Sequence, residues 1–151
     1  MRKTEVRSIG GGAGRGSVYV DTSAWIAFFS ARDQNHADAE RLFREAIDRK
    51  VRLITTNLVL AEIHRLILHR AGADAARFAL DRIESGALVT IEFATGTHHV
   101  AARSWLDKLK GHPVTYADAV GFAVIEDFRC TGYLSFDSDF LRAGFRPWAP
   151  R

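Results

Sequence analysis

The chain has 151 residues, 47% of them hydrophobic, which is the size and composition of one globular domain with a sizeable core. No apolar run is long enough to span a membrane as a helix, and a single cysteine, Cys130, excludes an intrachain disulfide and a zinc site built from several cysteines. The formal net charge of +3 is carried entirely by residues 1–16, so the overall charge is no evidence for nucleic-acid binding by the rest of the chain.

Residues 1–16 are basic and rich in glycine. We expect a flexible arm here, either a natural extension or a remnant of an expression tag, followed by one domain over residues 17–151. The arm lacks the apolar stretch that a secretory signal requires. We therefore expect a cytoplasmic protein with no membrane association.

Strand and helix patterns alternate along the rest of the chain. In chain order we expect a strand at 18–22, helices at 23–30 and 35–50, a strand at 52–56, helices at 57–70 and 73–85, a strand at 88–93, helices at 95–109 and 115–128, a strand at 132–135 and an edge strand at 145–148. Asn35 and Asn57 are the expected N-caps of their helices, and Gly72 ends the helix before it. Alternating strands and helices predict an α/β fold, a three-layer α/β/α sandwich with a mostly parallel central sheet.

Acidic residues occupy unusual positions on this map. Asp21 follows the first strand, and Asp137 and Asp139 follow the strand at 132–135, so all three lie at carboxyl ends of strands, where open α/β sheets form their sites. Glu62 and Asp118 lie within helices and share a helical face with apolar residues.

Most of these residues also have a purely structural explanation. Asp21 is a suitable N-cap for the helix that follows it. Thr115 and Asp118 have the spacing of a capping box. Asp137 and Asp139 flank a serine and are typical turn residues.

Glu62 is harder to explain structurally, because burying an unpaired carboxylate on an apolar stripe costs several kcal/mol, to order of magnitude. No set of buried arginines is evident to compensate the acids, and converging like charges raise one another's pKa values. A divalent metal removes this conflict, since Mg²⁺ and Mn²⁺ bind carboxylate oxygens and water. The histidines show no metal-binding pattern.

Four segments carry these acids in the order and context found in PIN-domain ribonucleases. They are VYVDTSAWIAFF around Asp21, TTNLVLAEIHRLI around Glu62, TYADAVGFAVIEDF around Asp118 and YLSFDSDF around Asp137. The chain resembles in particular the VapC-type toxins of bacterial type II toxin–antitoxin pairs. The resemblance extends over about residues 18–148.

This resemblance implies a metal-dependent endoribonuclease. Its acidic residues would hold one or two Mg²⁺ or Mn²⁺ ions that activate water and steady the scissile phosphate of RNA. The principal catalytic and metal-binding residues would be Asp21, Glu62 and Asp118, with Asp137 as the fourth acid and Asp139 as a weaker metal-ligand candidate. Hydroxyl groups that orient the site would come from Ser23, Thr115 and Ser135, although capping and turn roles are equally open for the last two.

The resemblance also implies partners: an RNA substrate, a small VapB-type antitoxin that blocks the site, and a second copy of the chain in a homodimer. Some apolar residues exceed the obvious needs of a small sheet, among them Trp25, Phe29, Phe43 and Leu68. Some of these are candidates for the interfaces, although core packing is the commoner role for any one of them. A non-cleaving RNA-binding or regulatory module, a housekeeping PIN nuclease and a related DNA nuclease stay open as alternatives. A phosphoacceptor receiver domain fits less well, because the lysine expected after a late strand is absent after residues 133–136.

Overall fold

The computed structural model describes residues 16–150, so all but the last residue of the expected arm at 1–16 lies outside the described residues. A parallel sheet of four strands forms the centre, with the order β3-β2-β1-β4. The strands are β1 (Ser17–Val20), β2 (Arg52–Thr56), β3 (Val89–Glu92) and β4 (Gly132–Leu134). Residues 18–20 of β1 are fully buried, as expected for a strand covered on both faces.

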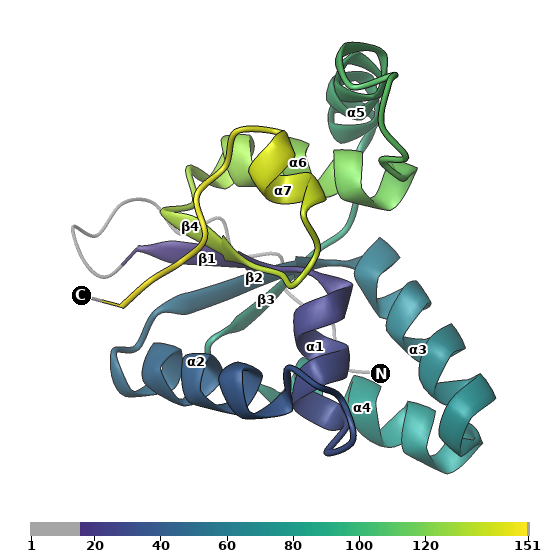
Figure 1. Ribbon diagram of the computed structural model, residues 1–151, viewed down its shortest axis with the longest axis vertical. Helices are drawn as coiled ribbons and strands as arrows, with labels where there is room; N and C mark the ends of the chain where they lie inside the picture. The colour runs from purple at the N-terminus through teal and green to yellow at the C-terminus, as the bar shows by residue number, and fades with distance from the viewer. Residues whose placement is uncertain (1–15, 151) are drawn as a thin grey trace, which may run out of the picture.

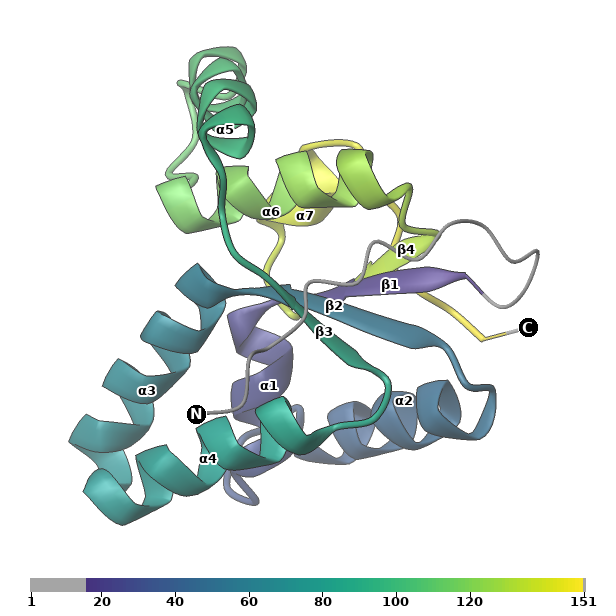
Figure 2. The same ribbon diagram turned by 180° about the vertical axis from the view of Figure 1, so that it is seen from behind.

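Helices cover both faces of the sheet (Figures 1 and 2). One layer contains α1 (Thr22–Phe29), α2 (His36–Asp48), α3 (Asn57–Ala71) and α4 (Ala73–Ser85). The other layer contains α5 (Gly96–Lys108), α6 (Tyr116–Phe128) and α7 (Asp139–Arg142). The predicted three-layer α/β/α architecture with a parallel sheet is confirmed.

The strand order creates a switch point between β1 and β4. From β1 the chain adds β2 and then β3 on one side, with the connecting helices on one face. It then returns through α5 and α6 on the other face to place β4 on the opposite side of β1. The chain leaves β1 toward one face of the sheet and leaves β4 toward the other. Open α/β sheets form their binding sites at such a point, outside the carboxyl ends of the two strands.

The start of α3 differs from the expectation. Thr56, not Asn57, is the N-cap, and its hydroxyl oxygen accepts a hydrogen bond from the Val59 N–H at 3.2 Å. The side-chain oxygen of Asn57 instead accepts from the Ala94 N–H at 2.9 Å and so ties α3 to the segment after β3. Asn35 occupies the predicted N-cap position of α2, but its side chain makes no capping hydrogen bond. Gly72, with φ of +90°, ends α3 as predicted.

The predicted edge strand at 145–148 is not a regular strand. A single bridge pairs Tyr133 with Pro147. The Tyr133 N–H donates to the Arg146 carbonyl at 3.1 Å, and the Trp148 N–H donates to the Tyr133 carbonyl at 2.8 Å. Proline has no N–H, so this segment cannot extend the ladder, but it still covers the β4 edge.

Aromatic side chains fill the space on both faces of the sheet. Tyr19 stacks on Phe140 at 5.6 Å between ring centroids, and Trp25 packs against Phe43 at 4.8 Å. Trp25 and Phe43 are buried, so of the two roles open for them core packing holds, whereas Leu68 is exposed. Within residues 16–150, no helix is long and apolar enough to cross a membrane.

Candidate active site

Three carboxylates meet at the switch point of the sheet. Asp21 directly follows β1, Asp118 lies in the first turn of α6, and Asp137 follows β4. One oxygen of each lies within 4.8 Å of the others. We call these three residues the acid cluster. Of the acids that the sequence predicts to converge, the structure brings these three together.

Asp21 is buried in the cluster rather than used as a helix cap. It occupies the N-cap position of α1, but its side chain makes no capping hydrogen bond. Its Oδ2 accepts a hydrogen bond from the Ser135 hydroxyl at 3.1 Å. The pKa of Asp21 is raised from 3.8 to about 7. Burial is the main cause and the charge of Asp118 adds to it, while the hydrogen bond from Ser135 offsets part of the rise.

Asp118 belongs both to the N-terminal capping box of α6 and to the acid cluster. The predicted capping box is present: the Asp118 N–H donates to the Thr115 hydroxyl at 3.1 Å, and the Thr115 N–H donates to Asp118 Oδ2 at 3.2 Å. The pKa of Asp118 is raised from 3.8 to about 6: burial raises it most, the hydrogen bonds from Thr115 offset part of that rise, and the charges of Asp137 and Asp139 add to it. Thr115 therefore holds the carboxylate of Asp118 at the start of α6.

Ser23 and Ser135 connect α1 to the segment after β4. The Ser135 hydroxyl donates to Asp21, so it can only accept from Ser23, whose Oγ lies 3.0 Å away. Ser23 Oγ in turn accepts from the Phe136 N–H at 2.9 Å, and Ser135 Oγ accepts from the Asp137 N–H at 3.0 Å. The two serines thus fix the backbone that carries Asp137 relative to Asp21.

Glu62 is half-buried on α3 and lies outside the group of three. The expectation of a buried carboxylate is therefore only partly correct, because this part of α3 stands at the open carboxyl edge of the sheet. Thr22, the first residue of α1, donates its hydroxyl hydrogen bond to Glu62 Oε2 at 2.5 Å. Sequence reasoning missed Thr22, although its position between Asp21 and Ser23 was a signal. The charge of Glu62 contributes to the raised pKa of Asp21.

The carboxylate of Asp139 is paired with an arginine side chain. Arg142 donates to Asp139 Oδ1 at 2.7 Å, and the Asp139 N–H donates to Asp137 Oδ1 at 3.0 Å as the chain turns into α7. Burial and the charge of Asp137 raise the pKa of Asp139, and Arg142 lowers it. The predicted turn is thus present, and Asp139 lies beside the acid cluster rather than in it.

The acid cluster suits a divalent cation. All its donors are oxygens, as Mg²⁺ and Mn²⁺ prefer. Ligands on opposite sides of a Mg²⁺ ion lie about 4 Å apart, so a span of at most 4.8 Å closes with small side-chain rotations. The raised pKa values of Asp21 and Asp118 mean that their negative charge is not compensated by the protein.

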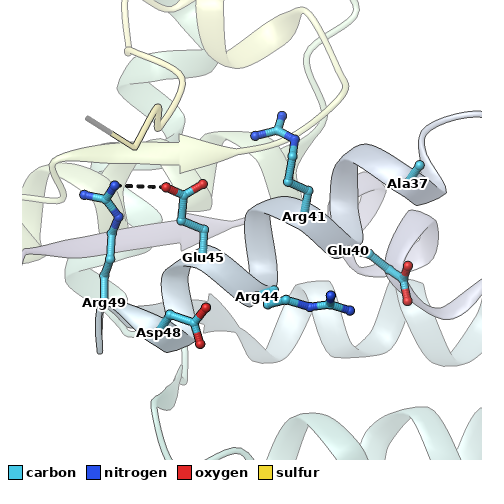
Figure 3. A pocket seen from close by; sticks show the side chains of 7 residues that line it. All are labelled: Ala37, Glu40, Arg41, Arg44, Glu45, Asp48 and Arg49. Carbon is cyan, nitrogen blue, oxygen red and sulfur yellow. Dashed lines mark hydrogen bonds and ion pairs between the residues drawn. The ribbon is translucent and has the colours of Figure 1, made fainter.

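A hollow of about 550 Å³ lies along α2 and contains none of the cluster residues (Figure 3). Its charged side chains are of both signs, and Arg49 pairs with Glu45 at 2.9 Å. The seven residues that line it belong to this helix or to its C-cap, Arg49: Ala37, Glu40, Arg41, Arg44, Glu45, Asp48 and Arg49. Charges of both signs along one exposed helix face are typical of a solvated surface.

Comparisons with known proteins identify the family. The PIN domain model matches residues 18–146. The 23S rRNA-specific endonuclease VapC20 of Mycobacterium tuberculosis is 33% identical over 128 residues, which cover 85% of this chain and 95% of that protein. Ribonuclease VapC26 of the same organism is 27% identical over 80% of this chain and 86% of its own length.

Two solved structures share the fold of this chain. The crystal structure of M. tuberculosis VapC20, described as a Sarcin-Ricin loop cleaving toxin, matches with a TM-score of 0.80 and 32% identity, covering 89% of this chain and all of that one. A toxin–antitoxin complex from Klebsiella pneumoniae matches at a TM-score of 0.61 and 16% identity over 82% of this chain and 90% of its own, which shows a shared fold. With the family model covering most of its length and a relative at 33% identity, the chain belongs to the PIN-domain family.

Proposed function

We propose that this protein is a metal-dependent endoribonuclease of the VapC type, which hydrolyses phosphodiester bonds of RNA. The observation that carries the proposal is the acid cluster of Asp21, Asp118 and Asp137 at the switch point of the sheet. It is supported by the 33% identity to a relative named as an rRNA-specific endonuclease.

In this proposal the acid cluster holds Mg²⁺ or Mn²⁺. When bound, the ion would supply an activated water and neutralise charge that develops on the scissile phosphate. Water adds to phosphorus as the bond to one ribose oxygen breaks, and that oxygen takes up a proton. The Glu62 carboxylate, which accepts a hydrogen bond from Thr22, would be the fourth acid of the site.

The neighbouring residues position the acid cluster. Ser135 holds Asp21, Ser23 holds Ser135, and Thr115 holds Asp118. Asp139 is the least suitable ligand, because Arg142 already pairs with its carboxylate. We propose that it supports Asp137 through the backbone hydrogen bond between them.

Cleavage of RNA tests the proposal directly. Purified protein should cut single-stranded or loop RNA with Mg²⁺ or Mn²⁺, and EDTA should stop it. Asp118→Asn should abolish cleavage, because it removes a charge from the acid cluster at nearly constant volume. Asp81→Asn is the matched control, since it makes the same change at an exposed position on α4. Undiminished cleavage by Asp118→Asn, or in EDTA, would refute the site.

We propose further that the protein is a cytoplasmic toxin that forms a homodimer and is inhibited by a small VapB-type antitoxin. The fold shared with a protein from a toxin–antitoxin complex supports such a partner. Expression alone should arrest growth, and co-expression of a neighbouring small gene should relieve it, with the two products co-purifying. A harmless protein that nevertheless cleaves RNA would instead be a housekeeping PIN nuclease.

A further inference from the structure

Tyr19 carries a buried hydroxyl group that has no hydrogen-bond partner. The side chain is fully buried, and among residues 16–150 its hydroxyl oxygen is the only buried side-chain nitrogen or oxygen atom that makes no hydrogen bond. A buried hydroxyl without a partner is unfavourable, because it has given up its hydrogen bonds to water. Such a group in a folded protein indicates a partner that is not a protein side chain, such as an ordered water.

The backbone directs this hydroxyl toward the acid cluster. Tyr19 lies in β1 two positions before Asp21, whose backbone is also extended, so both side chains leave the same face of the sheet. That face is covered by α6 (Figures 1 and 2), and a Cβ at Gly121 of α6 would lie 2.6 Å from the Tyr19 hydroxyl oxygen. Gly121 is one turn after Asp118 on the same side of the helix. The hydroxyl therefore lies between the strand that leads to Asp21 and the helix that carries Asp118.

The charges of the acids act on Tyr19. Burial is the main cause that raises the pKa of Tyr19 well above its usual value, and the negative charges of Asp21, Asp118 and Glu62 raise it further. The Thr56 hydroxyl is near enough to lower this pKa, but the two groups form no hydrogen bond of acceptable geometry. Tyr19 therefore keeps its proton and is a hydrogen-bond donor close to three carboxylates.

The other donors to the acid cluster come from different directions. Ser135, in the segment after β4, donates to Asp21 at 3.1 Å, and the Thr115 N–H at the start of α6 donates to Asp118 at 3.2 Å. A carboxylate has two oxygens and about four lone-pair sites, so each group can accept further hydrogen bonds. Tyr19 would supply a donor from the inner side, where the sheet and α6 meet. Partners of this kind fix the orientation of carboxylates that bind a metal.

We propose that Tyr19 is a positioning residue of the acid cluster: its buried hydroxyl donates a hydrogen bond to one water, which in turn donates to Asp21 and Asp118 and holds them ready for a cation. The water would make about three hydrogen bonds, as buried waters usually do. This inference rests on the cation site of the proposed ribonuclease and adds a residue that supports it from inside the fold. It also gives Gly121 a role, because a side chain there would occupy the place of the hydroxyl.

Magnesium binding tests the role of the hydroxyl. Tyr19→Phe removes the hydroxyl and keeps the ring that packs against Phe140. We expect the Mg²⁺ affinity of the full chain, measured by titration calorimetry, to fall by about 10- to 100-fold, while urea unfolding in EDTA shows a normally folded protein. Tyr133→Phe is the matched control. Tyr133 lies opposite Tyr19 in the sheet, is buried and also packs against Phe140, but burial alone raises its pKa. Its variant should bind Mg²⁺ like wild type.

Nuclear magnetic resonance checks the same contact without altering Tyr19. The chain has three tyrosines, so ¹³C labelling at Cζ gives three signals, and Tyr116→Phe and Tyr133→Phe assign two of them. The Cζ shift of a tyrosine responds to hydrogen bonding of its hydroxyl. Adding Mg²⁺ should move the Tyr19 signal with the dissociation constant found by calorimetry and leave the Tyr133 signal in place. In Asp118→Asn the Tyr19 signal should no longer respond.

Three results would overturn this role: a Tyr19→Phe protein that binds Mg²⁺ as tightly as wild type, an equal loss of affinity in Tyr133→Phe, or a Tyr19 signal that does not move with Mg²⁺. RNA cleavage is measured in parallel. A wild-type protein whose Mg²⁺ binding depends on Tyr19 but which cuts no RNA contradicts the ribonuclease proposal alone. A wild-type protein that cuts RNA, with a Tyr19→Phe variant that binds Mg²⁺ equally well, contradicts the role of Tyr19 alone.

Discussion

Thr22 and Glu62 are joined by a hydrogen bond of 2.5 Å between residues 40 positions apart in the chain. Thr22 begins α1, and Glu62 lies in the middle of α3. Because a carboxylate at an open edge is free to turn toward solvent, this bond determines which way Glu62 points.

Removing the Thr22 hydroxyl should therefore weaken metal binding without damaging the fold. Thr22→Val keeps the shape and loses the donor, and we expect metal affinity to fall by about 10- to 100-fold. Thr22→Ser keeps the donor and should stay close to wild type. Titration calorimetry with Mn²⁺ measures both. Equal affinities for the Val and Ser variants would show that Glu62 needs no such support.

The free energy of unfolding of the metal-free protein should fall as the pH rises. The Asp21 carboxyl has a pKa of about 7 in the folded protein instead of 3.8, so the folded state holds this proton more tightly than the unfolded state. Stability from this proton is fully present below about pH 4 and is lost as the pH approaches 7, at about 1.4 kcal/mol per pKa unit.

The variant Asp21→Asn isolates this effect, because it cannot lose the proton. In EDTA, urea unfolding at a series of pH values from 5 to 8 should show the variant gaining stability relative to wild type as the pH rises. A stability difference that does not change with pH would mean that Asp21 is not buried among like charges.

A divalent cation should stabilise the folded state. Mg²⁺ or Mn²⁺ at 100 times its dissociation constant should add about 2.7 kcal/mol, because the carboxylates converge only in the folded chain. Differential scanning fluorimetry should show this as a higher Tm for wild type and for Asp81→Asn, and a much smaller rise for Asp118→Asn. If Asp118→Asn responded fully, the cation would bind elsewhere.

Gly121 should not tolerate a side chain. A Cβ at this position in α6 would lie 2.6 Å from the Tyr19 hydroxyl oxygen and 2.8 Å from its Cζ. Tyr19 is fully buried against Phe140 and cannot move away. We expect Gly121→Ala to destabilise the protein by about 1–3 kcal/mol, outweighing the gain of about 1 kcal/mol in helix propensity.

Urea unfolding measures this cost, and cleavage by the folded fraction reports any movement of Asp118, one turn earlier in α6. Gly111→Ala is the control, since nothing lies within 4 Å of a Cβ there. A Gly121→Ala protein as stable as wild type would mean that α6 moves away from β1 at little cost.

The sequence by itself determined the order of the elements and the acids that meet. Hydrophobic periodicity is local, so it predicts β1, α6 and their neighbours, and the carboxyl ends of parallel strands must share an edge. That is why Asp21 and Asp137 were predictable as neighbours at one edge, whereas Asp118, which lies on a helix, was assigned to the site by the resemblance of its segment to PIN-domain ribonucleases. The capping box of Thr115 and Asp118 was predictable for the same local reason.

Only the tertiary structure decided which partners the polar side chains around the site bond to. Thr22 bonds to Glu62, Ser135 to Asp21 and Asn57 to Ala94 across gaps of 37 to 114 residues. Such pairs have no spacing rule, because they depend on how far each helix is rotated and shifted on the sheet. Asp139 and Arg142 are only three residues apart, so their ion pair follows the local spacing of a helix, but the short helix α7 that contains them was not predicted. Local patterns specify a residue's element and face, whereas side-chain contacts at a site follow from packing between elements that are distant in the chain.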